Sequence, residues 1–281
     1  NYKPDLLIFG HADLIKNDTL SYLKDNYKNL RIAQWFLDPL IKDGPDFAKN
    51  KARILDKIEF TDANFVTTSP DVLNFLPRNK PCLFMPNPAD TSFEVLNNYE
   101  NSQCSMDVFF ALSHGVHRGI LKKGKYDERT DFVNKLVEIT PNVKFDLYGI
   151  NNVQPIWADS FLKSISNAKM GVNLSRGDPT KYYSSDRITQ LIGNGLLTFI
   201  HKNTLYNNFF SNSEVGFYNN ISSLSEKIQK FARDDLLRKK IAKRGKLKYM
   251  KYFNSTIVAD YIINNTFNKN YKKNKYLWED K

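Results

Sequence analysis

The sequence predicts an α/β protein of two Rossmann-like domains that face a cleft, with the first domain small or truncated. Short apolar strands alternate with longer amphipathic helices along almost the whole chain, which is the pattern of parallel sheets covered by helices on both faces. The chain has 281 residues, which is longer than a domain with a single hydrophobic core usually is. Its composition, 41% hydrophobic and 25% charged, is that of a globular protein and argues against extensive disorder.

The first domain is expected at residues 1–88. Its clearest helix covers residues 46–60, where the side chains of Phe47, Ile54 and Ile58 recur at helical spacing. The chain begins with Asn rather than Met and enters a strand within a few residues, so we expect a first strand-helix unit to be missing. The expected strands are Asp5–Phe9, Arg31–Phe36, Asn64–Thr68 and Cys82–Met85.

A linker is expected at residues 89–105. This segment and its neighbours are rich in proline, asparagine and serine and lack apolar periodicity. Pro86 and Pro88 stiffen the exit from the preceding strand and prevent a helix from continuing across it. A second domain is then expected at residues 106–253, and a C-terminal helix with a basic tail at residues 254–281.

The second domain continues the same alternation of strands and helices. Its expected strands are 106–113, 143–149, 169–175, 196–200 and 214–218, its expected helices are 127–139, 159–168, 222–232 and 234–250, and a further helix is expected at 255–267.

The charge balance is strongly basic. Lysine and arginine number 41 against 30 aspartates and glutamates, a net charge of +11. Nucleic acid, an anionic membrane surface and phosphorylated substrates all fit this charge, and so does a solvated lysine surface that has no partner.

Cys82 and Cys104 lack the spacing of a disulfide framework or zinc site, which favours a cytoplasmic location. No apolar stretch approaches the roughly 18 residues of a membrane span.

The stretch SSDRITQLIGNGLLTFI, residues 184–200, has the pattern of an anion-binding helix start. With Ser184 as N-cap, the first turn would leave backbone N–H groups for a phosphate, and Arg187 would add donors beside them. Asp186 would pair with this arginine or accept hydrogen bonds from sugar hydroxyls. The alternative is that these residues only cap a helix and carry surface charge.

In its context this stretch resembles the donor-binding half of GT-B glycosyltransferases, in particular the CgeB-like group with an Arg-x-x-Glu helix. The resemblance runs from about Met106 to Ile263. It rests on the ordered series DVFFALS, FDLYG, FLKSISNAKMGVNLS, the arginine-led helix and its glycine turn. Gln190 stands where the family usually has glutamate on the donor ribose, and Tyr182 stands where the wider clan has a further glutamate.

The resemblance implies a metal-independent hexosyltransferase without a cofactor, which moves a sugar from a nucleotide-diphosphate donor to a glycan or lipid-linked acceptor. The expected place is the cytoplasm, with peripheral contact to the anionic inner face of the membrane. The implied donor-binding residues are Ser113, Arg118, Gly149, Ser184, Ser185, Asp186, Arg187 and Gln190. Arg118 is expected at the diphosphate and Gly149 at the nucleotide base. The alternatives are that Arg118 is a solvated loop arginine and that Gly149 only forms the turn that ends a strand.

Two residues of the first domain are candidates for the catalytic base. His11 and Asp38 each lie just past a strand end, the edge where α/β proteins bind ligands. A histidine there could take a proton from an acceptor hydroxyl, since imidazole titrates near neutral pH. A polar loop histidine and a turn aspartate are the alternatives.

Other functions stay open at this point. The missing acidic pair fits a non-catalytic glycan-binding protein with a degenerate glycosyltransferase fold. The positive charge fits a nucleic-acid-binding protein, although the regular basic and aromatic motifs of common RNA modules are absent from the sequence. A nucleotide-sugar epimerase of the same architecture would use the donor without an acceptor.

Overall fold

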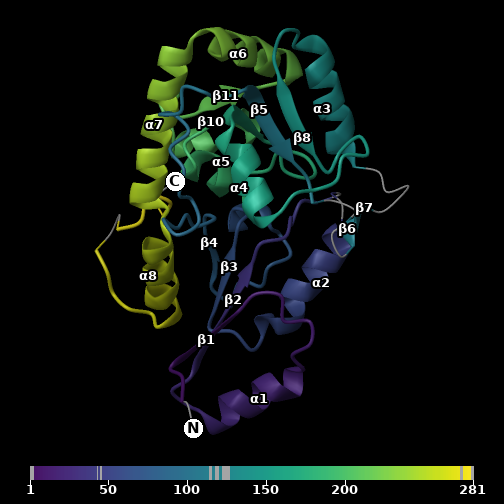
Figure 1. Ribbon diagram of the computed structural model, residues 1–281. Helices are drawn as coiled ribbons and strands as arrows, with labels where there is room; N and C mark the ends of the chain where they lie inside the picture. Colours follow the sequence, from purple (N-terminus) through teal and green to yellow (C-terminus); the bar gives the residue numbers. More distant parts are fainter. Residues whose placement is uncertain are drawn as a thin grey trace. The chain divides into compact units, whose positions relative to one another are not determined.

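The computed structural model (Figure 1) describes residues 3–42, 44, 46–113, 116–117, 120–121, 127–272 and 275–279, with the backbone alone for 116–117 and 120–121. The chain forms two units. Unit 1 comprises Asn1–Pro88, Gly177–Ser185 and Tyr252–Lys281, and unit 2 comprises Ala89–Arg176 and Asp186–Lys251.

Unit 1 is built on a four-stranded parallel sheet in the order β1-β2-β3-β4. Neighbouring strands are therefore consecutive in sequence, and the carboxyl ends of all four lie at one edge of the sheet. The elements are β1 (Leu6–Phe9), α1 (Asn17–Asn26), β2 (Arg31–Phe36), α2 (Phe47–Ile58), β3 (Ala63–Val66), a 3-10 turn (Pro70–Val72), β4 (Cys82–Phe84) and α8 (Ser255–Thr266).

Alternation along β3 explains how helices cover both faces of this sheet. Val66 packs with Ile54 of α2 on one face. The preceding residue, Phe65, points to the opposite face and meets Tyr261 of α8, with ring centroids 5.8 Å apart. Figure 1 shows α2 and α8 on either side of the sheet. The C-terminal helix α8 thus packs on one of the two faces of the unit 1 sheet.

Residues 177–185 also belong to unit 1, although they precede α5 of unit 2. The Ser69 amide donates to the Lys181 carbonyl at 3.0 Å, and the Lys181 ammonium lies 2.6 Å from the Asp71 carboxylate. The Tyr182 ring, 2% exposed, packs 5.0 Å from the Phe84 ring between centroids.

Unit 2 has a five-stranded parallel sheet in the order β11-β10-β9-β5-β8. A two-stranded antiparallel ribbon, β6 (Val116–His117) with β7 (Ile120–Leu121), follows β5. The other elements are β5 (Met106–Ala111), α3 (Glu128–Ile139), β8 (Phe145–Tyr148), α4 (Ala158–Ser166), β9 (Ala168–Asn173), α5 (Arg187–Gly193), β10 (Leu197–His201), 3-10 turns (Lys202–Thr204 and Tyr206–Asn208), β11 (Gly216–Tyr218), α6 (Ile221–Arg233) and α7 (Asp235–Tyr252).

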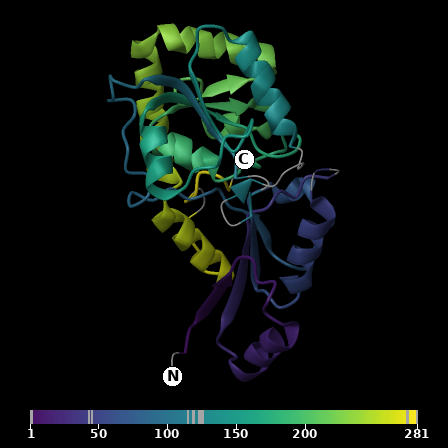
Figure 2. The same cartoon turned by 45° about the vertical axis from the view of Figure 1, so that its right-hand side comes forward.

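Successive residues of β5 point to the two cores of unit 2. Phe110 lies in a core that also contains side chains of α3, α6 and α7. Phe109 lies in the core formed with α4 and α5. Figure 2 shows the helices around this sheet. The predicted α/β class with two Rossmann-like units is confirmed.

The segment 89–105, expected as a linker, packs as part of unit 2. The Asn98 amide donates to the carbonyls of Ile165 and Ala168 at 2.6 and 2.8 Å. The Leu96 amide donates to the Asn194 side chain at 3.1 Å. Polar side chains in this asparagine-rich stretch therefore supply hydrogen bonds in place of regular secondary structure, which the sequence pattern did not reveal.

Candidate functional site

The carboxyl edge of the unit 2 sheet contains a topological switch point. The first strand of the unit, β5, is followed by β8 on one side and then by β9 on its other side. Connections that leave two neighbouring strands in opposite directions open a crevice above them, where ligands of doubly wound sheets bind. The site is therefore expected above the ends of β5 and β9.

The Arg187 side chain lies at this switch point. Its Nη1 donates to the carbonyl of Leu174, just after β9, at 2.7 Å, and its Nη2 donates to the carbonyl of Ala111, the last residue of β5, at 3.0 Å. The guanidinium carbon lies 4.9 Å from the centroid of the Phe110 ring. The arginine thus joins the two strand ends and brings a permanent positive charge to the crevice.

The helix start differs from the sequence expectation in one respect. Ser184 is not the N-cap, because its hydroxyl donates to the Ser185 carbonyl at 2.9 Å. Helix α5 begins at Arg187 with Asp186 before it, and the Asp186 carboxylate makes no cap hydrogen bond. Asp186 is exposed, yet the surrounding protein displaces enough water to raise the pKa of its carboxyl, an effect that the Arg187 charge opposes. The Ser184 carbonyl accepts from the Asn87 amide at 2.9 Å, so Ser184 has a structural role in unit 1.

Gly149 and Ser113 lie at the same edge as Arg187. Gly149 follows β8 with φ +70°, and a Cβ built on it would stand 1.9 Å from the Leu112 carbonyl oxygen. Only glycine fits this close approach of two strand ends. Ser113 is exposed and directly follows Leu112. Arg118 lies outside the described residues.

Gln190 is half-buried on α5, and its carbonyl accepts from the Asn194 side chain at 2.9 Å. Tyr182, at the position of the clan's upstream glutamate, is buried in unit 1 against Phe84. It therefore fills a core and has no surface to offer to a ligand.

In unit 1 the two base candidates contact each other. The His11 Nε2 lies 3.2 Å from the Asp38 Oδ2, with the two side chains 43% and 32% exposed. Their strands β1 and β2 are paired and parallel, so residues two positions beyond each strand end come together. An ionised carboxylate only accepts hydrogen bonds, which makes Nε2 the donor and leaves Nδ1 with the lone pair of a base.

Arg53 of α2 completes this cluster. Its Nη1 donates to Asp38 at 3.1 Å, and its Nε and Nη2 both donate to the Asp13 carboxylate. The Arg53 hydrogen bond is the main cause that lowers the pKa of the Asp13 carboxyl. Neither Arg53 nor Asp13 was predicted. Arg53 lies in an ordinary amphipathic helix, which gives no sign of a site. Asp13 could have been predicted, because it follows the same strand end as His11.

The cluster borders a cavity of about 370 Å³ between the loop after β1, strand β2 and helix α2. Lys57, which lines it, donates to the Ile15 carbonyl at 2.6 Å and to the Asn17 side chain at 2.8 Å. Gln34, which also lines it, donates to the Asn64 side chain at 2.6 Å. The cavity combines a histidine, two carboxylates, one amide and two cations, groups that suit a polyhydroxylated ligand. Across the described residues, no group of three or more histidine, cysteine, aspartate or glutamate side chains has metal-binding geometry.

A family model described as "Glycosyl transferase-like" matches residues 129–264, slightly less than half of the chain. The matched segment runs from α3 to α8 and includes β8, β9 and α5. None of the curated protein sequences matches this chain.

Solved structures resemble the chain over nearly its whole length. S. aureus TarM has a TM-score of 0.61 at 14% identity, over 93% of this chain and 54% of TarM. Anabaena HepE in complex with UDP and glucose has a TM-score of 0.63 at 10% identity, over 94% of this chain and 78% of HepE. Sucrose-phosphate synthase of Thermosynechococcus elongatus has a TM-score of 0.60 at 11% identity, over 92% of this chain and 72% of the synthase chain. The chain spans about half of the TarM chain. The predicted GT-B fold is thus confirmed.

Proposed function

We propose that this protein is a glycosyltransferase that transfers a sugar from a nucleotide diphosphate to a glycan or lipid-linked acceptor. The observation that carries the proposal is the Arg187 guanidinium, held at the switch point of unit 2 between the ends of β5 and β9. A fixed cation in that crevice suits a diphosphate, whose negative charge grows as the sugar bond breaks. The family match and the UDP-bound neighbour HepE support the same reaction class.

Unit 1 would hold the acceptor. His11 Nδ1 would take the proton of the acceptor hydroxyl, while Asp38 fixes the ring through Nε2. The acceptor oxygen then forms a bond to the anomeric carbon, the bond from that carbon to the diphosphate breaks, and the nucleoside diphosphate leaves. The cavity beside His11 offers the polar side chains that hydroxyl groups of a sugar bind.

Calorimetric titration with UDP-, GDP-, ADP- and TDP-sugars tests the donor assignment. We expect one nucleotide to bind in the micromolar to millimolar range typical of enzyme substrates. Absence of binding for all four at millimolar concentration would refute the assignment. Donor hydrolysis or epimerisation without an acceptor would show a different reaction on the same fold.

Replacing Arg187 by alanine should weaken donor binding by about ten- to a hundredfold, because a hydrogen bond to a charged group contributes roughly 1.5–3 kcal/mol. The change also leaves the carbonyls of Ala111 and Leu174 without this donor, so we expect some loss of thermal stability. Titration of the variant measures the affinity. Arg233→Ala removes the same charge from an exposed position on helix α6 and should leave the affinity unchanged; an equal loss in both variants would contradict the role of Arg187.

Metal-independent hexosyl transfer is part of the proposal, since the resemblance to GT-B enzymes implies it. Transfer measured with a hexose donor should proceed equally with and without EDTA. Loss of activity in EDTA, restored by Mg²⁺ or Mn²⁺, would show that a metal ion takes part.

A second candidate function is a non-catalytic glycan-binding protein. Gln190 favours it, because an amide binds a ribose hydroxyl more weakly than a carboxylate does. Binding of a glycan, together with a donor that binds but is not consumed, would support this second function. Gln190→Glu would then test whether the missing carboxylate is the cause.

A cytoplasmic protein in peripheral contact with an anionic membrane completes the proposal. The charge of +11 supports it. In the described parts of the chain, no helix is long and apolar enough to cross a bilayer.

A further inference from the structure

A second cavity of about 430 Å³ lies in unit 2 between α6, α7 and the start of β11. Val215 and Gly216 at its wall are at the amino end of their strand, so the cavity opens at the edge of the sheet opposite to Arg187. It is therefore separate from the proposed donor site, and nothing in the proposed reaction uses it.

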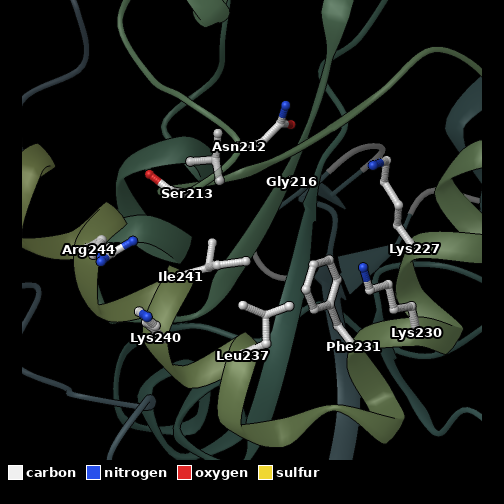
Figure 3. Close-up of a pocket in the computed structure, with 11 residues that line it drawn as sticks. Asn212, Ser213, Gly216, Lys227, Lys230, Phe231, Leu237, Lys240, Ile241 and Arg244 are labelled. Atoms are coloured by element: carbon white, nitrogen blue, oxygen red, sulfur yellow. The ribbon is translucent and has the colours of Figure 1, made fainter.

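The cavity has an apolar floor bordered by cations. Figure 3 shows the floor residues Phe231, Leu237 and Ile241 in the middle, Lys227 and Lys230 of α6 on one side, and Lys240 and Arg244 of α7 on the other. None of the described residues that line it is acidic. Lys230, Lys240 and Arg244 are exposed, and within the described ranges none of the four cations forms an ion pair.

Other basic residues of α7 have structural tasks that these four lack. Arg238 is fully buried and donates to Asp235, while Lys246 donates to main-chain carbonyls of residues 94 and 96. Lys248 lies 3.0 Å from the Glu214 carboxylate. Lys240 and Arg244 of α7, together with Lys227 and Lys230 of α6, therefore remain available for a partner.

The outer face of α7 adds exposed leucines to these cations. Leu236 is 84% exposed and Leu247 is 57% exposed. Helical spacing of i, i+4, i+7 and i+11 puts them on one face with Lys240 and Lys243. Leucines that project from a basic helix face insert into the boundary between lipid headgroups and acyl chains, where lysines meet anionic phosphates.

We infer that the α6–α7 cavity and the outer face of α7 form a seat for the anionic phospholipids of a bilayer. Phosphate headgroups contact Lys227, Lys230, Lys240 and Arg244, the start of an acyl chain meets the apolar floor, and Leu236 and Leu247 enter the interface. This inference extends the proposed peripheral membrane contact and gives it a location. It also favours a bilayer over single-stranded nucleic acid, because proteins that bind single strands place exposed aromatic rings beside the cations, and Phe231 is only 8% exposed.

Co-sedimentation of the full chain with vesicles tests the inference. We expect binding to vesicles that contain phosphatidylglycerol, little binding to pure phosphatidylcholine, and weaker binding in high salt. Lys230→Glu/Lys240→Glu should reduce the partition coefficient at least about tenfold, since each cation near the membrane surface strengthens the electrostatic attraction to anionic lipids. The matched control Lys28→Glu/Lys163→Glu changes the net charge equally at exposed positions elsewhere and should bind nearly as well as the unaltered protein.

Leu236→Asn is a second, independent variant. Its side chain is almost entirely in solvent, so the fold should be retained, and we expect vesicle binding to fall about three- to fivefold. Any one of four results would overturn the inference. These are no binding to anionic vesicles, an equal loss in the matched control, displacement from vesicles by millimolar glycerol 3-phosphate, and a loss of RNA binding with vesicle binding intact. UDP titration of the same variants keeps the two proposals apart, because donor binding at the opposite edge should not change.

Discussion

His11→Gln should reduce the rate of sugar transfer by about a hundred- to ten-thousandfold, the usual contribution of a general base. Glutamine keeps a hydrogen-bond donor for Asp38 but cannot accept a proton at neutral pH. Donor affinity should stay unchanged, because the proposal assigns donor binding to Arg187 of unit 2 and not to His11. Steady-state kinetics with donor and acceptor varied separately measures both quantities.

His201→Gln is the matched control for this prediction. His201 is the last residue of β10, but its Nε2 bonds to the Asn219 carbonyl and its Nδ1 accepts from the Asn203 amide, so it has no lone pair available for a substrate. We expect its transfer rate to change less than about tenfold. Similar losses in the two histidine variants, or full activity in His11→Gln, would exclude His11 as the base.

Asp38→Asn separates orientation from proton transfer. The amide can present either its oxygen or its NH₂ group to Nε2, so the ring is no longer held in one tautomer. An intermediate loss of rate, with His11 still required, fits a residue that orients the base. A loss as large as that of His11→Gln would instead indicate that the carboxylate itself takes the proton.

The fold could be predicted from the sequence because its signals are local. Apolar strands and helices with periodic stripes, such as residues 46–60, indicate their own secondary structure and hence the parallel sheets. The sequence does not show which sheet each helix packs against. Helix α8 packs on unit 1 because the sheet face that contains Phe65 is otherwise uncovered, and no local sequence pattern shows this. The same limit applies to residues 89–105, whose side-chain hydrogen bonds join them to unit 2.

The candidate site could be predicted in position but not in contacts. Strand ends such as those before His11, Asp38 and Gly149 mark the ligand edge of a parallel sheet. Whether two such residues touch depends on strand order, and adjacent β1 and β2 unite His11 with Asp38. The sequence also could not show that Arg187 donates to two main-chain carbonyls rather than pointing freely at a ligand.

Gly149→Ala should be among the most damaging single substitutions in unit 2. The new Cβ would stand 1.9 Å from the Leu112 carbonyl oxygen, at φ +70°. Both atoms belong to the ends of paired strands, where the Leu112 amide donates to the Tyr148 carbonyl at 2.9 Å, so relief requires β5 and β8 to separate. We expect a loss of roughly 2–5 kcal/mol in the free energy of unfolding, from overpacking and left-handed backbone strain together.

Urea unfolding followed by circular dichroism measures the effect of Gly149→Ala, with Gly10→Ala as the matched control. A Cβ on Gly10 would meet only the Trp35 carbonyl oxygen at 3.8 Å, an ordinary contact, and its stability should change by less than about 1 kcal/mol. Gly149→Asn distinguishes the two causes. Asparagine tolerates positive φ, yet it carries the same Cβ, so it should be about as unstable as alanine if the clash dominates. Recovery of stability with asparagine would show that backbone strain, and not the close approach of β5 and β8, makes glycine necessary here.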